Sequence, residues 1–274
     1  MSTIESAAII GLGLIGGSLA RDLAARGVRV FAWDRDEASA RIAVEQGIAR
    51  PLRWDEPLDV IVLAVPVLAA RKLLHEVSAR SRSVRLITDV GSTKRSIVRA
   101  AAGSEIATRF VGSHPLAGDH RSGWDASRTG LFEGAPVYLT PSEFTDDDAL
   151  ELARELWMMV GAVPEVMDAA EHDRRLAWTS HLPQAASTAL ARALAEAGIQ
   201  RSDLGPGGRD VTRLAGSSAE MWADILIDNA DEVAPTLAVM ATQLSAIRDA
   251  AASGDRDRLR ALWAAANHWH AEHP

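Results

Sequence analysis

Short apolar runs alternate with amphipathic segments through the first 167 residues of the chain. Residues 60–65 are apolar without a break, which is typical of a strand whose two faces are both buried in a parallel sheet. Residues 16–26 and 146–160 carry apolar side chains at helical spacing, and Gly27 is placed to cap the first of these helices. This alternation predicts an α/β domain. The predicted strands are residues 7–10, 28–33, 60–65, 84–89, 110–112, 137–139 and 163–167.

The pattern changes after about residue 168, where the strand signals stop. The segments that follow are rich in alanine and leucine at helical spacing, and they predict an all-α second domain. We therefore expect two domains, residues 1–167 and 168–274, that share an interface because no low-complexity linker separates them. Alanine-rich helices in this position often pack across a two-fold axis, so a homodimer is expected. The predicted helices are residues 174–196, 219–229, 233–251 and 255–270.

The composition is that of an ordinary globular protein and excludes several classes of function. The formal net charge of −8 argues against a basic surface for nucleic acid or anionic lipid. Without cysteine, the chain has no disulfides, cysteine nucleophiles or thiolate metal sites. The N-terminus lacks a signal-peptide pattern, and the longest apolar run, residues 60–70, is far shorter than the roughly 20 residues of a membrane helix. A cytoplasmic protein is expected, with neither a nucleic-acid nor a membrane partner.

A GxGxxG motif, formed by Gly11, Gly13 and Gly16 with Leu14 and Ile15 inside it, joins the first predicted strand to the first helix. The first glycine allows a tight turn, the second lets a pyrophosphate approach the backbone, and the third lets the helix pack closely on the strand. The helix N-terminus also offers free N–H groups to the phosphates. Because a second strand ending in an acid follows, the motif predicts a dinucleotide-binding Rossmann domain rather than a merely structural turn.

Asp34 is that acid, at the carboxyl end of the second predicted strand. A carboxylate there accepts hydrogen bonds from both ribose hydroxyls of NAD and repels the 2′-phosphate of NADP. Arg35 comes next and partly offsets that preference. Val65, at the end of the predicted strand 60–65, is a further candidate contact of the cofactor. The expected cofactor is NAD, with NADP as the alternative.

Two further motifs follow later strands and fall at the carboxyl end of the sheet, where ligands bind in open α/β folds. They are Asp-Val-Gly-Ser-Thr-Lys at residues 89–94 and Gly-Ser-His-Pro-Leu-Ala-Gly at residues 112–118. His114 is the candidate catalytic base, because oxidation of an alcohol by hydride transfer requires the hydroxyl proton to leave, and a neutral imidazole suits that task. Pro115 favours an extended backbone at His114, which helps to fix its direction. The alternative is a structural histidine that hydrogen-bonds the backbone.

Ser92 and Lys94, in the first of these motifs, each allow two interpretations. Ser92 either hydrogen-bonds the substrate hydroxyl or orients His114, or it caps the helix that begins near Thr93. The two roles of Ser92 are compatible. Lys94 is either a contact to a substrate carboxylate or a surface residue in the first turn of that helix.

Together these motifs resemble the prephenate/arogenate dehydrogenase family of tyrosine biosynthesis. The resemblance spans residues 7–229, and the later helices match in character only. It implies a Rossmann domain followed by a helical dimerisation and substrate-binding domain. It also implies an enzyme that removes hydride from the ring carbon bearing the hydroxyl, while the ring carboxylate leaves as carbon dioxide and the ring becomes aromatic. The matching segments are residues 11–18, 89–94, 113–118, 130–134, 171–173, 180–183, 209–215 and 221–225.

The resemblance implies roles for single residues as well. His114 matches the family's catalytic histidine, Ser92 its serine partner, and Arg213 the arginine that binds a substrate carboxylate. His181 lies on a segment matching the family's His-Leu-Pro-His, and the fourth position here is Gln184. Glutamine hydrogen-bonds but carries no charge, so the substrate is either prephenate or arogenate.

Asp119, just after the histidine motif, bears on the same choice. Arogenate carries an ammonium group, which a nearby acid would favour; otherwise Asp119 is a solvated loop residue. The histidines of residues 268–273 do not share one helical face, so no metal site is expected. No regulatory domain is expected after the helices.

The expected function is the NAD-dependent oxidative decarboxylation of prephenate to 4-hydroxyphenylpyruvate. Alternatives are an arogenate (cyclohexadienyl) dehydrogenase that makes tyrosine, and the same chemistry on an amino-substituted prephenate in secondary metabolism. A reductase of a small imine or 3-hydroxy acid also joins a Rossmann domain to a helical dimer, but the Ser-His-Pro loop argues against it. A non-enzymatic regulator that binds NAD and a partner protein would not need Ser92, His114 and Arg213 together.

Overall fold

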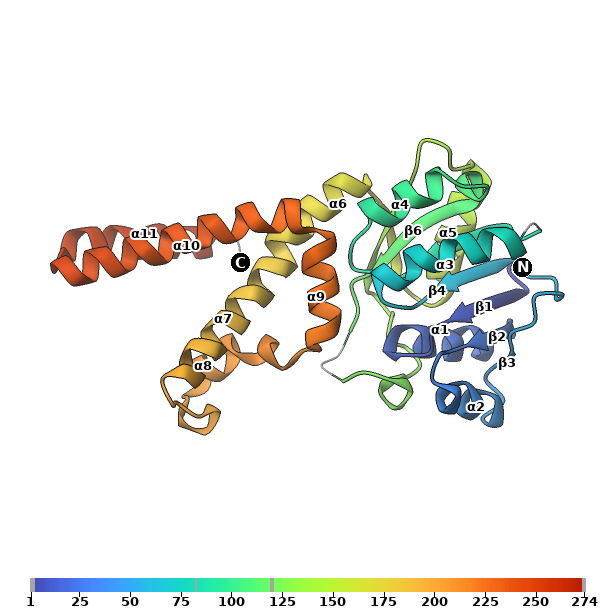
Figure 1. Ribbon diagram of the computed structural model, residues 1–274, viewed down its shortest axis with the longest axis horizontal. Coiled ribbons are helices and arrows are strands. Elements are labelled where there is room, and N and C mark those ends of the chain that lie inside the picture. Colours follow the sequence, from blue (N-terminus) through green and yellow to red (C-terminus); the bar gives the residue numbers. More distant parts are fainter. Residues whose placement is uncertain (1–2, 82, 119–120, 273–274) are drawn as a thin grey trace. The chain divides into compact units, whose positions relative to one another are not determined.

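The computed structural model describes residues 3–81, 83–118 and 121–272. By its internal contacts the chain divides into two compact units, residues 1–229 and 230–274 (Figure 1). The first unit holds the sheet, the helices on its faces and the first part of the helical segment. The second unit consists of helices α10 (Ala230–Ser253) and α11 (Arg256–Glu272). The domain boundary predicted at residue 167 lies just after the last strand and stays a prediction.

Within the described residues, eight strands form one sheet in the order β3-β2-β1-β4-β5-β6-β7-β8. Neighbouring strands pair in parallel, apart from the antiparallel pair β6 and β7. The order reverses between β1 and β4, which creates the crevice where ligands bind in such sheets. The strands are β1 (Ser6–Ile10), β2 (Arg29–Trp33), β3 (Arg50–Pro51), β4 (Val60–Leu63), β5 (Leu86–Asp89), β6 (Phe110–Pro115), β7 (Pro136–Pro141) and β8 (Val163–Val166).

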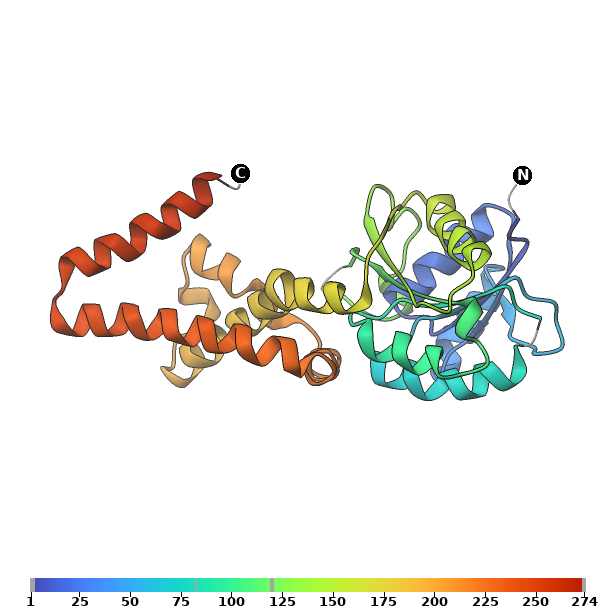
Figure 2. The same ribbon diagram turned by 90° about the horizontal axis from the view of Figure 1, so that it is seen from above.

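Helices cover both faces of the sheet (Figure 2). Side chains along each central strand point alternately to the two sides, so both faces carry apolar side chains that must be covered. In β1, Ala7 and Ile9 enter one apolar core, while Ala8 and Ile10 enter the other. The first core is closed by α1 (Leu14–Ala25), α2 (Glu37–Glu45) and α5 (Asp147–Met159). The second is closed by α3 (Val67–Arg80) and α4 (Arg95–Ala102). Both faces of the central strands are thereby removed from water.

Beyond β8 the first unit continues as helices, which in sequence order are α6 (Ala169–Leu176), α7 (Leu182–Glu196), α8 (Pro206–Val211) and α9 (Ala219–Asp228). The sequence predicted one helix over residues 174–196, but a π-helical turn, Ala177–His181, separates α6 from α7. Pro183 lies in the first turn of α7 and has no N–H for the preceding carbonyls, which explains why the helical hydrogen bonds are interrupted there.

The predicted fold class is confirmed: a Rossmann domain is followed by a helical segment. Three helices, α2, α3 and α8, were not predicted. Helix α3 follows β4 after a short turn at Pro66, so strand and helix merge into one apolar run in the sequence. Across residues 3–81, 83–118 and 121–272, no helix combines the length and apolar character needed to cross a membrane.

Candidate active site

The glycine turn between β1 and α1 is tightly packed on one side and open on the other. Gly11 has a φ of +102°, and a Cβ there would lie 2.2 Å from the carbonyl oxygen of Ala64. A Cβ on Gly16 would lie 2.0 Å from the carbonyl oxygen of Gly11, so α1 could not begin so close to the turn. A Cβ on Gly13 would meet no described atom within 4 Å. Space therefore opens where the second glycine of a dinucleotide fingerprint admits the pyrophosphate.

The carboxylate of Asp34 is fixed beside this turn, directly after β2. One oxygen accepts the backbone N–H of Leu12, and the other accepts the backbone N–H of Asp36 at 2.7 Å. A carboxylate has further lone pairs, so both oxygens keep the capacity to accept ribose hydroxyls. Arg35 is exposed. The residues present thus fit a bound dinucleotide.

The other predicted cofactor contacts lie at the same edge of the sheet. Leu14 and Ile15 are partly buried in the first turn of α1. Val65 follows β4, and its side chain lies 2.9 Å from where a Cβ of Gly11 would be. Their contact with a cofactor stays a prediction.

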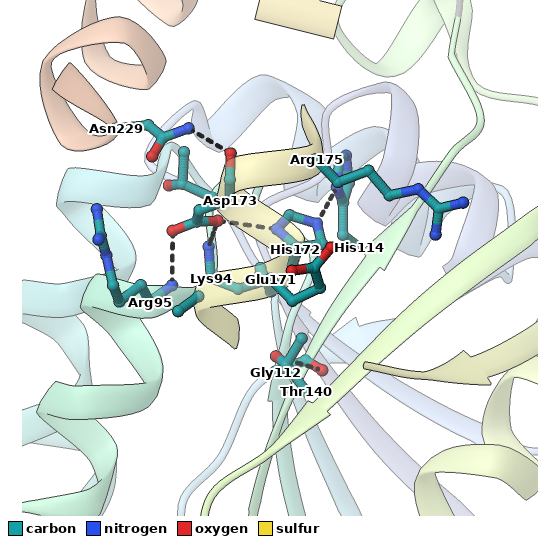
Figure 3. Close-up of polar contacts among 12 residues, drawn as sticks. Lys94, Arg95, Gly112, His114, Thr140, Glu171, His172, Asp173, Arg175 and Asn229 are labelled. Carbon is teal, nitrogen blue, oxygen red and sulfur yellow. Dashed lines mark hydrogen bonds and ion pairs between the residues drawn. The ribbon is translucent and has the colours of Figure 1, made fainter. Parts of the chain in front are cut away.

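His114 stands near the end of β6, with only 9% of its surface exposed. Its Nδ1 lies 2.9 Å from Nε2 of His172 in α6, and the two rings meet edge to face (Figure 3). His172 Nδ1 lies 2.8 Å from a carboxylate oxygen of Asp173. Three side chains from two distant segments therefore form a continuous polar chain at the sheet edge.

The Asp173 carboxylate has a second task at the start of α4. Its two oxygens accept the backbone N–H groups of Lys94 and Arg95, at 2.7 and 2.9 Å (Figure 3). These are amide groups at a helix N-terminus, which have no partner within the helix. Asp173 therefore holds α6 against α4 with the same carboxylate that orients His172.

The direction of these bonds assigns the hydrogen atoms on both rings. An ionised carboxylate only accepts, so Nδ1 of His172 carries the hydrogen bonded to Asp173. In a neutral ring Nε2 of His172 then accepts, which means that Nδ1 of His114 donates. The lone pair of His114 is left at Nε2, the atom available to take up a proton.

Burial keeps both histidines neutral. It lowers the pKa of His114 well below its usual value of 6.5, and repulsion from the positive charge on Lys94 adds to the effect. Burial also lowers the pKa of His172, although its hydrogen bond to Asp173 acts the other way. Burial alone would raise the pKa of Asp173, but hydrogen bonds from His172 and from two backbone N–H groups lower it. The site thus pairs an ionised carboxylate with two neutral imidazoles.

The structure contradicts the interpretation of Lys94 as a surface residue. The side chain is fully buried, and its ammonium group bonds the Asp89 carboxylate and, at 2.8 Å, the carbonyl oxygen of Ser113. Burial lowers the pKa of Lys94 and raises the pKa of Asp89, each opposed by the partner's charge. Lys94 joins the ends of β5 and β6 beneath the site, and its contact with a substrate carboxylate stays a prediction.

Ser92 lies partly exposed in the turn between β5 and α4. The N-terminal amides of α4 bond Asp173, so capping falls to that residue instead of Ser92. The hydrogen bond that orients His114 comes from His172. Of the roles predicted for Ser92, contact with the substrate hydroxyl stays a prediction.

Gln184 is buried in α7 and uses its amide within the protein. Its Nε2 donates to the carbonyl oxygen of Leu214 at 2.7 Å, and its Oε1 lies 3.5 Å from the hydroxyl of Ser217. This amide therefore holds the short helix Arg213–Gly216, and its contact with substrate stays a prediction. Arg213 itself is exposed at the start of that helix.

His181 is also buried, and its Nδ1 lies 3.2 Å from the side-chain amide of Asn229. Burial lowers the pKa of His181 to about 4. Asp119, the predicted contact to an ammonium group, lies outside the described residues. Among the residues that are described, no group of three or more His, Cys, Asp or Glu side chains is arranged to hold a metal ion.

Sequence reasoning missed His172 and Asp173 as members of the site. They belong to a matching segment, but His172 is 58 positions away from His114, and no local spacing connects them. The one available signal was a His-Asp pair soon after the last strand, in a chain with few histidines.

Both parts of the chain match models of one protein family. Residues 19–166 match the family described as the nucleotide-binding domain of prephenate dehydrogenase, and residues 168–265 match its dimerization domain. The cyclohexadienyl dehydrogenase of Zymomonas mobilis is 33% identical over 273 residues, which cover 94% of this chain and 92% of that protein.

Solved structures give the same result. The prephenate dehydrogenase of Aquifex aeolicus, in complex with hydroxyphenyl propionate and NAD+, superposes with a TM-score of 0.89 at 29% identity, covering 99% of both chains. The arogenate dehydrogenase of Synechocystis superposes with a TM-score of 0.80 at 28% identity, covering 98% of this chain and 100% of the other.

The glycine turn yields a test that separates binding from folding. In Gly13→Ala the new methyl group enters open space, so we expect the free energy of unfolding to change by less than about 0.5 kcal/mol. NAD affinity should fall at least roughly tenfold because the pyrophosphate can no longer approach. Urea unfolding and NAD titration measure the two quantities. Gly16→Ala is the matched comparison, since its methyl group meets backbone and should destabilise the fold. Wild-type NAD affinity in Gly13→Ala would contradict this account of the turn.

The buried histidines predict how stability depends on pH. The pKa of His181 is about 4 in the folded protein and near its usual 6.5 when unfolded, so the unfolded state binds more protons between these values. Stability is therefore complete above pH 6.5 and is lost as the pH falls toward 4, by about 1.4 kcal/mol per pH unit for this group. His114 and His172 act in the same direction. Urea unfolding at several pH values measures the slope, which His181→Asn should reduce and replacement of the exposed His75 should not.

Proposed function

The chain belongs to the prephenate dehydrogenase family, and from this membership we propose that it oxidises and decarboxylates prephenate to 4-hydroxyphenylpyruvate with NAD. The observation that carries the proposal is the buried chain His114–His172–Asp173 at the edge of the sheet that also carries the glycine turn. A neutral imidazole beside a dinucleotide site is the arrangement that oxidation of an alcohol requires.

In the proposed reaction, Nε2 of His114 takes the proton of the ring hydroxyl. NAD supplies the acceptor for the hydride that leaves the same carbon. The bond to the ring carboxylate breaks, its electron pair completes the aromatic ring as carbon dioxide departs, and the ring oxygen takes the proton back from His114. The charge gained by His114 is stabilised through its Nδ1–H bond to His172, which the Asp173 carboxylate holds in place.

In this proposal, Ser92 and Arg213 bind the substrate directly. Ser92 hydrogen-bonds the hydroxyl, and the exposed guanidinium of Arg213 binds a carboxylate with two parallel hydrogen bonds. Gln184 contributes indirectly, by fixing the helix that begins with Arg213. His181 stays neutral because of its low pKa, so it adds no positive charge to the substrate site.

Arogenate is the second candidate substrate. The Zymomonas relative is a cyclohexadienyl dehydrogenase and the Synechocystis neighbour an arogenate dehydrogenase, so the family spans both choices. The amide of Gln184 is committed to Leu214, which leaves it without a part in the choice. Prephenate is favoured because both matching family models, and the Aquifex structure that covers 99% of this chain, are those of prephenate dehydrogenase.

We further propose a homodimer formed through the helical residues. Residues 168–265 match a dimerization domain, and several large apolar side chains there are exposed. Large apolar side chains left exposed in such number are typical of a protein–protein interface. We also propose a cytoplasmic location, where NAD serves biosynthetic dehydrogenases. The exposed apolar side chains within residues 168–265 are Trp178, Leu190, Ile199, Val211, Met221, Ile227, Leu237, Val239, Leu244 and Trp263.

Turnover tests the proposed reaction directly. The protein is mixed with NAD and prephenate, and the absorbance of the reduced cofactor is followed; arogenate and NADP are then tested in the same way. Prephenate with NAD should give the highest kcat/KM. His114→Asn should lower kcat by roughly two to four decades, because the proton acceptor is lost. Near-wild-type turnover in that variant would remove His114 from its role, and reduction of NAD by neither substrate would refute the function.

Arg213 is tested by separating binding from chemistry. Arg213→Ala should raise KM for the substrate by at least about tenfold with a smaller change in kcat, since the carboxylate contact is present before and during the reaction. Arg209→Ala, also exposed and on the neighbouring helix α8, is the matched control. An unchanged KM would show that another group binds the carboxylate.

A further inference from the structure

Asp228 is the last residue of α9, and Asn229 follows it directly. They are also the last two residues of the first compact unit. The carboxylate of Asp228 is only 2% exposed. Its Oδ2 accepts the hydroxyl of Thr93 at 2.6 Å and that of Ser96 at 2.7 Å. Its Oδ1 accepts a guanidinium N–H of Arg71 from α3 at 3.1 Å. One buried carboxylate therefore joins α9, α3 and the start of α4.

Asn229 is completely buried and reaches the other catalytic segment. Its Nδ2 donates to the backbone carbonyl of Asp173 at 2.8 Å (Figure 3). The same atom lies 3.2 Å from Nδ1 of His181. Because a buried amide is costly to leave without partners, these bonds fix the side chain in one orientation. Asn229 thus holds α6 at the residue that orients His172.

Asp228 and Asn229 together hold the two segments of the site, which are the turn that carries Ser92 and the start of α6 that carries His172. Thr93 directly follows Ser92, so the bond from Asp228 fixes the turn that presents Ser92. Asp173 is hydrogen-bonded to His172, which is hydrogen-bonded to His114. The hydrogen bond from Asn229 to Asp173 therefore helps to fix all three side chains. A single dipeptide on α9 therefore holds both segments in register.

We propose that Asp228 and Asn229 are positioning residues for the reaction: they act through Ser92 and through His172, and not on the substrate. The inference rests on the proposed function for the roles of Ser92 and His114, and it assigns α9 a part in catalysis. A displacement of about 1 Å at a reacting group is enough to reduce turnover by roughly a hundredfold.

A double-mutant cycle tests the role of Asp228. Asp228→Asn puts an amide where three donors converge, and we expect kcat to fall about ten- to a hundredfold with NAD affinity unchanged. In a Ser92→Ala background the same change should reduce kcat by less than about twofold, because the group being positioned is already absent. Glu220→Gln, an exposed acid in the first turn of the same helix, is the control and should leave kcat unchanged.

Asn229 is tested by the corresponding cycle with His172. Asn229→Leu keeps the shape but removes both donated bonds, and its effect on kcat should largely disappear in a His172→Ala background. If Asp228→Asn does not fold, Thr93→Val removes the same bond from the other side and enters the cycle instead. Equal losses of kcat in both backgrounds, or lower thermal stability with wild-type kcat, would overturn the proposal.

The cycles remain informative if the substrate is not prephenate. NAD titration of the parent protein reports the cofactor site, and the cycles are run with whichever of prephenate and arogenate the parent turns over. A parent that binds NAD but oxidises neither refutes the proposed function, and the positioning role with it. A parent that is active on either substrate while the losses are additive refutes the positioning role alone.

Discussion

The site depends on the carboxylate of Asp173, which accepts hydrogen bonds from two different segments of the chain. Asp173 accepts two backbone N–H groups at the start of α4 and also the ring N–H of His172. Two of these donors, the N–H groups of Lys94 and His172, are buried, and each would cost roughly 1–3 kcal/mol if left unsatisfied. The same bonds that join α6 to α4 therefore determine which way His172 points, and through it the direction and tautomer of His114. Structure and chemistry are coupled at this residue.

Burial around Asp173 makes the site both rigid and electrostatically defined. The low pKa of His114 keeps its imidazole neutral, the state that accepts a proton, and the buried Lys94 beneath the strand ends reinforces it. A protonated imidazole is unstable when it is buried unless its charge is stabilised. The hydrogen bond from His114 to His172, which is bonded to the ionised carboxylate of Asp173, stabilises that charge. The Lys94–Asp89 pair contributes a second effect, since it ties β5 to β6 where the two catalytic loops leave the sheet. The same packing thus keeps His114 neutral and fixes the two catalytic loops.

Much of this could be predicted from neighbours in the chain. The alternation of apolar runs and helical periods indicated the fold class, and the glycines at 11, 13 and 16 had the packed and open sides that the fingerprint requires. The motif at residues 112–118 identified His114, which lies near the end of β6 as expected. Such features are encoded within a few residues of one another, because turn geometry, strand burial and helix starts depend on local side chains. The boundary between β4 and α3 was hidden because both are apolar.

The partners of those residues were decided by the tertiary structure. His172 lies 58 positions from His114, and their pairing follows from helix α6 packing against β7 and α4. The same holds for Lys94 and Gln184: charge and position in a motif suggested ligand contacts, but the ammonium is buried on Asp89 and the amide bonds Leu214. A sequence shows which side chain can donate or accept and where its backbone turns. Which group it meets depends on strand order and helix packing, which are long-range, and on burial, which decides whether a polar atom must be satisfied by the protein itself.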